Sequence, residues 1–260
     1  MIALSAGGAA VVVDPETGGR LASLGVAGQE RLVTSADSPT GWGCFPMAPW
    51  AGRVRAGRFR WAGVEHQLPL RLPPHAAHGT VLDRPWRVVS EDERGVVMEI
   101  DLGPDWPWPG RAVHEVRLAP HRLDLRLEVH AEGEPFPASC GWHPWFRRSV
   151  ELDIDATSLW RRDGSDIPTG ELVPAPATAE GLDDCLTGLR RAPRLRWPDG
   201  LALEVLSSCE HVVVFTQPEH ALCVEPQTGP PDALNLSPRV VGSEPLVASA
   251  TLRWGAPVPT

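Results

Sequence analysis

Proline and glycine limit this chain more than any other feature of its sequence. The 260 residues include 28 prolines and 25 glycines, and few windows of about 12 residues are free of both. Proline lacks the backbone donor that a helical turn needs and clashes with the turn before it. We therefore expect few helices and many short extended segments separated by turns.

One segment shows the extended pattern without interruption. Within residues 121–130, Leu123, Leu125, Leu127 and Val129 alternate with charged side chains. Successive side chains of a strand point to opposite faces of a sheet, so this alternation predicts an antiparallel strand with one buried and one wet face.

Similar short runs recur along the whole chain. A hairpin turn is expected at residues 62–63, and an irregular connection with a turn at 166–170 is expected within 159–180. Many short strands with turns between them predict an all-β fold, a large antiparallel β-sandwich, as a single domain over residues 1–260. The other predicted strands are residues 10–14, 20–26, 58–61, 64–68, 96–102, 150–155, 201–206, 211–216, 221–225 and 246–254.

The composition excludes several kinds of chemistry. All 24 basic residues are arginine, and tyrosine is absent. Without lysine there is no Schiff-base nucleophile, no lysine-bound pyridoxal cofactor and no P-loop lysine. A net charge of -9 argues against a nucleic-acid partner. Proton transfer must therefore fall to His, Asp, Glu or Cys.

The cysteines and the N-terminal residues favour a cytoplasmic protein. Five scattered cysteines without a Cys-x-x-Cys pair are typical of reduced thiols. His75 and His78 lie three residues apart, but no acidic or thiol ligand is near in the sequence, so we expect no metal site. We also expect no signal peptide and no membrane segment. The cysteines are Cys44, Cys140, Cys185, Cys209 and Cys223.

Two residues are candidates for acid–base chemistry. His143 lies between Trp142 and Trp145, an apolar setting that disfavours the charged imidazolium unless an acid is near. Glu225 ends an apolar strand, where a carboxylate is costly unless it is paired or functional. The alternatives are a packed core histidine and a salt bridge at the end of a strand.

Other side chains near these candidates suit a polar ligand. Arg53 offers a guanidinium fork, His78 precedes a glycine, and Asp183 begins an Asp-Asp pair. Trp50 and Trp145 neighbour the polar candidates and could form a platform for a sugar ring, although core filling is the usual role of tryptophan. Solvated or structural roles remain the alternatives for all five.

In their order along the chain, these stretches resemble the aldose 1-epimerase (galactose mutarotase) family over nearly the whole sequence. An Arg-containing stretch before Gly-x-Phe is followed by His-Gly, by Gly-x-His-Pro-aromatic-Phe, by Leu-Asp-Asp and by Val-Glu-Pro-x-Thr-Gly. The matching segments are residues 53–59, 78–79, 141–146, 182–184 and 224–229.

The resemblance implies a fold, an activity and a set of roles. The fold is the galactose mutarotase-like supersandwich, and the activity is interconversion of the α and β anomers of a hexose such as glucose or galactose. His143 resembles the general acid that protonates the ring oxygen, and Glu225 resembles the general base at the anomeric hydroxyl. Arg53, His78 and Asp183 match positions that bind sugar hydroxyls. No cofactor and no metal are implied.

Two other functions stay open at this point. Gly52 stands where the family often has Asn, so the sugar is not fixed. A hexose-6-phosphate mutarotase is the first alternative, and it predicts a basic rim around the pocket. A non-catalytic sugar-binding module on the same fold is the second. The oligomeric state is left open.

Overall fold

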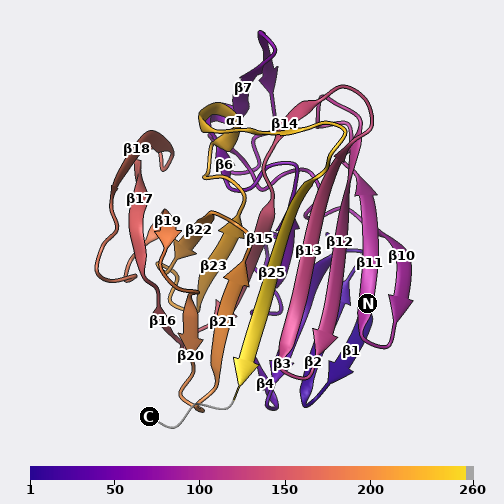
Figure 1. Ribbon diagram of the computed structural model, residues 1–260, viewed down its shortest axis with the longest axis vertical. Helices are drawn as coiled ribbons and strands as arrows, with labels where there is room; N and C mark the ends of the chain where they lie inside the picture. Colours follow the sequence, from indigo (N-terminus) through magenta and orange to yellow (C-terminus); the bar gives the residue numbers. More distant parts are fainter. Residues whose placement is uncertain (256–260) are drawn as a thin grey trace.

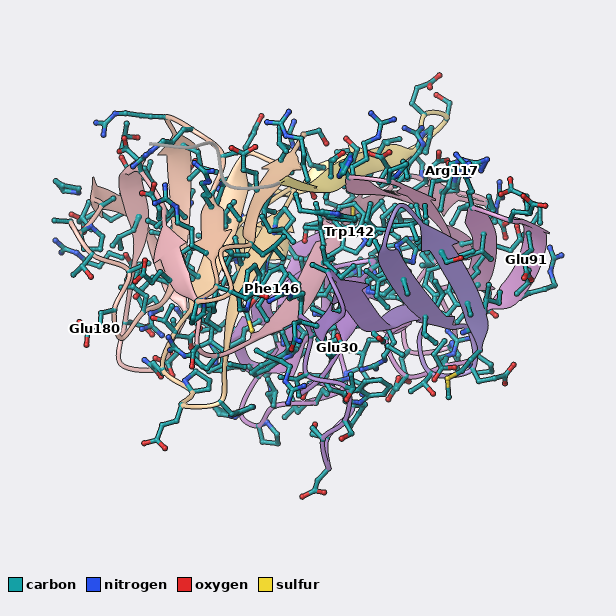
Figure 2. The ribbon with its side chains drawn as sticks, turned by 90° about the horizontal axis from the view of Figure 1, so that it is seen from below. Glu30, Glu91, Arg117, Trp142, Phe146 and Glu180 are labelled. Atoms are coloured by element: carbon teal, nitrogen blue, oxygen red, sulfur yellow. The ribbon has the colours of Figure 1, made fainter. Side chains whose placement is uncertain are left out.

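A computed structural model describes residues 1–255 of the chain, and these residues form two stacked antiparallel sheets (Figures 1 and 2). The expected all-β sandwich is thereby confirmed. The expected domain of residues 1–260 includes residues 256–260, which lie outside the described part. No helix in the described part is long and apolar enough to cross a membrane.

The first sheet has 11 strands and carries the N-terminal strands at one end. A two-residue strand, β4 (Gln29–Glu30), pairs with β3 beside this sheet. The other strands, in spatial order, are β1 (Ile2–Ala6), β2 (Ala9–Asp14), β3 (Arg20–Val26), β5 (Cys44–Met47), β15 (Gly141–Arg147), β23 (Ala221–Gln227), β22 (His211–Phe215), β19 (Asp183–Leu189), β17 (Ala156–Arg162) and β18 (Pro168–Pro174).

The second sheet has eight strands and covers one face of the first. Its longest members, β12, β13 and β25, form its centre. In spatial order the strands are β10 (Arg87–Asp92), β11 (Gly95–Asp101), β12 (Gly110–Ala119), β13 (Arg122–Ala131), β25 (Leu246–Gly255), β21 (Ala202–Ser207), β20 (Arg194–Arg196) and β16 (Glu151–Asp153).

Short elements gather at the upper end of the sandwich in Figure 1. They form three two-stranded ladders, one short helix and one 3-10 turn. The ladders are β14 (Phe136–Ala138) with β24 (Arg239–Val241), β6 (Arg53–Val54) with β9 (Ala76–Ala77), and β7 (Arg58–Trp61) with β8 (Val64–Gln67); the helix is α1 (Ala233–Leu236) and the turn is η1 (Arg55–Gly57).

One continuous apolar core fills the space between the two sheets. Trp142 and Phe146 of β15 belong to this core and are at most 1% exposed. Both lie in the middle of the molecule in Figure 2, between the labelled Glu91 and Glu180 at its two ends. Burying large aromatic side chains stabilises the fold by roughly 25 cal/mol for each Å² of apolar surface removed from water. The core thus fixes the position of the strands on which the site is built.

Most of the predicted strands are present, including the hairpin of β7 and β8 at Ala62-Gly63. The prediction of an irregular connection over residues 159–180 is wrong, because β17 and β18 form a hairpin there. This hairpin is the edge of the sheet and is mostly exposed, so it lacks the apolar alternation that marks a half-buried strand.

Candidate active site

One face of five adjacent strands forms the floor of the site, in the order β5, β15, β23, β22 and β19. Residues two apart in a strand share a face of the sheet. The register places one residue of each strand in a row across this face: Phe45, His143, Glu225, Val213 and Cys185. The intervening residues point into the core between the sheets, so the two faces serve packing and site separately.

His143 and Glu225 face each other across β15 and β23. The neighbouring pair Trp145–Cys223 sets this register, and Nε2 of His143 lies 3.2 Å from Oε1 of Glu225. Both side chains are buried, with exposed fractions of 6% and 4%. The imidazole stacks on Phe45 and on Trp145, with ring centroids 4.9 and 5.1 Å away. Nδ1 of His143 has no hydrogen-bond partner within residues 1–255.

Burial sets the protonation of this pair. Desolvation lowers the pKa of His143 well below its usual value, and the nearby His78 adds to this effect. Desolvation also raises the pKa of Glu225 well above its usual value, and the charge of Asp183 raises it further. Burial therefore favours a neutral imidazole beside a protonated carboxyl group, which is the reverse of the two groups' ordinary states at pH 7.

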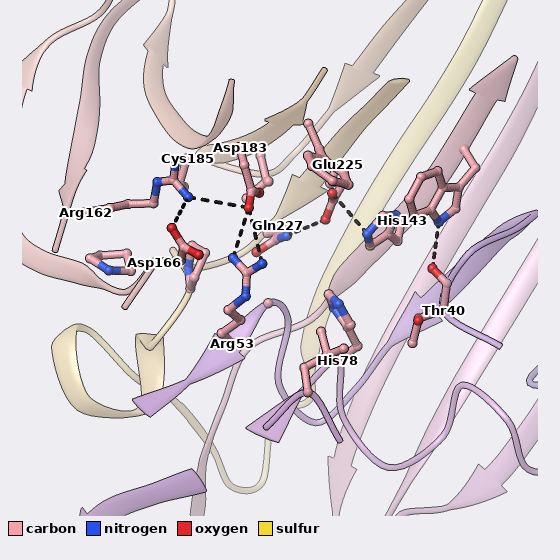
Figure 3. Close-up of a pocket in the computed structure, with 17 residues that line it drawn as sticks. Thr40, Arg53, His78, His143, Arg162, Asp166, Asp183, Cys185, Glu225 and Gln227 are labelled. Carbon is pink, nitrogen blue, oxygen red and sulfur yellow. Dashed lines mark hydrogen bonds and ion pairs between the residues drawn. The ribbon is translucent and has the colours of Figure 1, made fainter. Parts of the chain in front are cut away.

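A network of arginines and aspartates forms the wall of the site above β19. Both Nη atoms of Arg53 donate to Oδ2 of Asp183 at 3.2 Å, and Nη1 of Arg162 lies 3.4 Å from the same oxygen. Arg162 also binds Asp184 at 2.8 Å. Its contact with Asp166 at 2.9 Å is drawn in Figure 3. The two guanidinium groups thus hold the Asp183 carboxylate in one orientation, and carboxylates balance their charge.

His78 is positioned by a backbone conformation that needs its neighbouring glycine. Gly79 has φ +78°, and a Cβ there would lie 1.9 Å from the carbonyl oxygen of Ala48. Nδ1 of His78 lies 3.0 Å from Sδ of Met47, which can only accept, so Nδ1 donates and Nε2 remains an acceptor. Desolvation, helped by the charges of Arg53 and Arg71, lowers the pKa of His78 to about 3. The ring is therefore neutral at pH 7.

These residues surround a cavity of about 250 Å³ (Figure 3). Its lining is a mixture of charged, aromatic and small side chains. Contributions come from the sheet, from the loops around β6 and β9, and from the turn between β17 and β18. The lining residues are Thr40, Gly52, Arg53, Leu72, His78, His143, Trp145, Arg162, Asp166, Pro168, Asp183, Cys185, Val213, Phe215, Glu225, Gln227 and Pro231.

Six of the seven side chains expected at a site line this one cavity. They are His143, Glu225, Arg53, His78, Asp183 and Trp145. Trp50 does not line it. Its ring is 2% exposed and stacks on Trp106 with centroids 5.7 Å apart, so apolar packing directs it into the core.

Four polar lining residues were not expected at the site from the sequence: Thr40, Arg162, Asp166 and Gln227. Gln227 donates from Nε2 to Oε2 of Glu225 at 3.1 Å, and its own Oε1 is buried without a partner in the described part of the chain. It lies two residues after Glu225 on the same strand, so period-two reasoning from that carboxylate would have found it. Arg162 lies on the edge hairpin that the sequence did not reveal.

One group of side chains in the described residues has the spacing of metal ligands. A ring nitrogen of His143, Sγ of Cys223 and a carboxylate oxygen of Glu225 all lie within 4.8 Å of one another, and all three residues are buried. His, Cys and Glu are the ligand types of zinc sites.

Comparisons with known proteins agree with this architecture. A sequence profile of the family described as aldose 1-epimerase matches residues 1–248. The uncharacterized protein YphB of Escherichia coli K12 is 35% identical over 118 residues, which are 44% of this chain and 40% of that protein. The chain therefore aligns with less than half of the length of this curated relative.

Solved structures are similar over almost the whole chain. A candidate aldose 1-epimerase from Escherichia coli K12 has a TM-score of 0.86 at 22% identity, with 98% of each chain covered. A galactose mutarotase-like protein from Clostridium acetobutylicum also has a TM-score of 0.86, at 16% identity, with 98% of this chain and 94% of that chain covered. At these identities the likeness establishes the fold.

Proposed function

The chain belongs to the aldose 1-epimerase family, and we propose that it interconverts the α and β anomers of an unphosphorylated hexose such as glucose or galactose. One observation carries the proposal: His143 and Glu225 meet at 3.2 Å on the floor of a cavity that is lined by both charged and aromatic side chains. Exchange of anomers needs one group that takes the proton of the anomeric hydroxyl and another that gives a proton to the ring oxygen.

The proposed reaction uses these two side chains in turn. Glu225, as the ionised base, removes the proton from the hydroxyl on C1 while His143, as the protonated acid, gives its proton to the ring oxygen. The bond between C1 and the ring oxygen breaks, and the open-chain aldehyde forms. After rotation about the C1–C2 bond, the hydroxyl attacks the other face of the aldehyde and both transfers run backwards.

The pair needs only one proton in total for this cycle. Opening starts with one proton on His143, which goes to the ring oxygen, and ends with one on Glu225, which comes from the anomeric hydroxyl; closure reverses this. Without sugar, the pKa directions favour the proton on Glu225, so the reactive form for ring opening arises when this proton moves to Nε2 of His143 across their 3.2 Å contact. No proton has to come from solvent.

The other polar side chains suit sugar hydroxyls. Nε2 of His78 is an acceptor, Asp183 is a fixed carboxylate, and Arg53 is a fixed donor fork. Trp145 supplies an aromatic wall next to the acid, where C–H groups of a sugar ring can pack. These groups can orient the ring so that its anomeric hydroxyl reaches Glu225 and its ring oxygen reaches His143.

The charge of the cavity favours a neutral sugar over a sugar phosphate. Two arginines line it, Arg53 and Arg162, and both are already bound to aspartates. Asp166 and Asp183 offset their charge, so the basic rim expected for a hexose-6-phosphate enzyme is missing from the described lining residues. A phosphate dianion would have to displace a carboxylate from one of these arginines.

A non-catalytic sugar-binding module explains the pair less well. Burying a histidine and a glutamate in direct contact costs free energy, because each loses its hydration. A protein that only binds sugars could place hydrogen-bonding amides there at lower cost. Perturbed acid–base groups in a cavity are typical of catalysis.

The direct test is mutarotation measured by polarimetry from pure α-glucose and α-galactose. We expect His143→Gln and Glu225→Gln each to lower kcat by about 10²- to 10⁴-fold, the usual contribution of a general acid or base. The chain offers a matched control on β13 of the second sheet, where His130 lies 2.8 Å from Glu128 and neither residue lines the cavity. His130→Gln and Glu128→Gln should keep full activity. Unchanged activity in either variant of the buried pair would refute the proposal.

A further inference from the structure

Cys223 is a buried side chain beside the catalytic pair that the proposed reaction does not use. It lies two residues before Glu225 on β23 and therefore shares its face of the sheet, directly opposite Trp145. Its Sγ, a carboxylate oxygen of Glu225 and a ring nitrogen of His143 lie within 4.8 Å of one another.

The spacing of these atoms approaches that of a tetrahedral metal site. Two nitrogen or oxygen ligands at about 2.0 Å from a tetrahedral zinc ion lie roughly 3.3 Å apart. Nε2 of His143 and Oε1 of Glu225 are 3.2 Å apart. A sulfur ligand at about 2.3 Å from the same ion lies roughly 3.5 Å from each of the other two ligand atoms, and Sγ of Cys223 is within 4.8 Å of both.

The donor set selects the kind of ion. A thiolate, an imidazole and a carboxylate suit Zn²⁺ and related borderline cations, whereas Mg²⁺ and Ca²⁺ prefer oxygen ligands. Three protein ligands leave a fourth position, and His143 and Glu225 both line the cavity, so water or a sugar hydroxyl can fill it.

The local charge also favours a cation. Asp183 lies near both Glu225 and Cys223, and its negative charge would attract a dication to this place. Arg53 opposes this only in part, because its guanidinium is paired with Asp183. When the ion binds, Cys223 and Glu225 release their protons to solvent, and no oxidant or other reactant is needed.

We propose that His143, Cys223 and Glu225 form an inhibitory site for Zn²⁺ or a similar cation. The bound ion takes the lone pair of Nε2 and the carboxylate, so neither can exchange a proton with the sugar. The inhibitory part of the proposal rests on the proposed function, whereas the binding part stands alone. Because the ion and the sugar share these groups, they should compete.

The experiment combines binding and activity, with cobalt and zinc as the probes. Co²⁺ bound to a thiolate gives a near-ultraviolet charge-transfer band, which reports Cys223 without any sugar. Cys223→Ser removes the soft ligand at nearly constant volume, and Cys223→Ala is the second variant should the serine protein fold poorly. Cys209→Ala is the matched control, because it removes a half-buried thiol from a loop outside the cavity.

The expected results separate the two proposals. The wild type and the Cys209 variant should show the cobalt band and a zinc inhibition that chelator reverses. The Cys223 variants should keep mutarotation, lack the band and be inhibited at least about tenfold more weakly. Equal zinc sensitivity in the Cys223 variants, or no cobalt band in the wild type, overturns the metal site. Failure of the proposed function would instead leave the band intact in a protein without mutarotation.

Discussion

Replacing Glu225 with glutamine should stabilise the fold, and the gain should grow with pH. The carboxyl group is 4% exposed, and burial together with Asp183 raises its pKa well above the usual value. A carboxyl group with a raised folded-state pKa stabilises the fold fully below its unfolded pKa and loses that contribution as the pH rises toward the folded value. Glutamine keeps the shape and never ionises.

The size of the effect follows from the unfolded chain. Above a pH of about 4.5, unfolded Glu225 ionises while the folded side chain keeps its proton, so the wild type loses about 1.4 kcal/mol of stability for each pH unit relative to the variant. Between pH 5 and pH 7 the gap should widen by up to about 3 kcal/mol, which is a large part of the stability of an ordinary domain. The contribution of His143 to the pH dependence of stability has the opposite sign, because its lowered pKa costs stability as the pH falls below the ordinary imidazole pKa. This cost is present in both proteins and cancels in the difference between their stabilities.

Urea unfolding followed by tryptophan fluorescence at pH 5, 6 and 7 measures this gap, and 11 tryptophans provide the signal. Glu128→Gln is a control of opposite sign. Arg126 and His130 bind Glu128 and lower its pKa despite partial burial, so its stabilising contribution appears above the unfolded pKa and is lost as the pH falls. A gap between wild type and Glu225→Gln that stays constant or narrows as the pH rises would show that the buried carboxyl group is ionised in the folded protein, and the reasoning would fail.

Three further predictions address catalysis and folding. The pH profile of kcat/KM, followed by polarimetry over about pH 4 to 9, should fall on its acid side only well below the ordinary imidazole pKa. Activity is lost there when the pair takes up a second proton, and burial lowers the pKa of His143. A fall in kcat/KM at the ordinary imidazole pKa would contradict this. Arg162→Gln should raise KM for the hexose more than it lowers kcat, because Asp183 loses one of the two arginines that orient it; the opposite split would place Arg162 in the chemical step. Gly79→Ala should destabilise the fold by a few kcal/mol in urea unfolding, because its Cβ would lie 1.9 Å from the oxygen of Ala48. Gly8→Ala has a similar φ of +80° and no atom within 4 Å, so it measures the backbone strain alone, and an equal loss in both variants would contradict the steric argument.

A strand with one wet face can be found from its alternation, although β12, which alternates in the same way as β13, was not among the predicted strands. Residues 123–129 alternate between buried and more exposed positions in β13 as the pattern predicts. The central strand β15 is different, because six of its seven residues are buried and it contains a proline. A strand buried on both faces carries no alternation, so only its motif pointed to it. The edge hairpin of β17 and β18 escaped prediction for the reason given above.

The sequence predicted most residues of the candidate site but not how they are arranged in space. Apolar surroundings drew attention to His143, and the end of a buried strand drew attention to Glu225, but the 3.2 Å contact depends on a register between strands some 80 residues apart in the chain. Nothing local encodes that register. The same limit explains Trp50, whose closeness to Arg53 in sequence suggested a ligand contact, although its ring packs in the core.

The register between β15 and β23 has a consequence for how this protein can be altered. Directly opposite residues of paired strands have Cβ atoms about 5 Å apart, a spacing set by backbone hydrogen bonds. The acid and the base therefore keep their separation when the segments outside the main sheets that carry Arg53, His78 and Asp166 change in length or sequence. A single inserted residue inside β23 would instead turn Glu225 toward the core. To change the sugar that the protein accepts, these surrounding segments can be altered. The two central strands, β15 and β23, must keep their length.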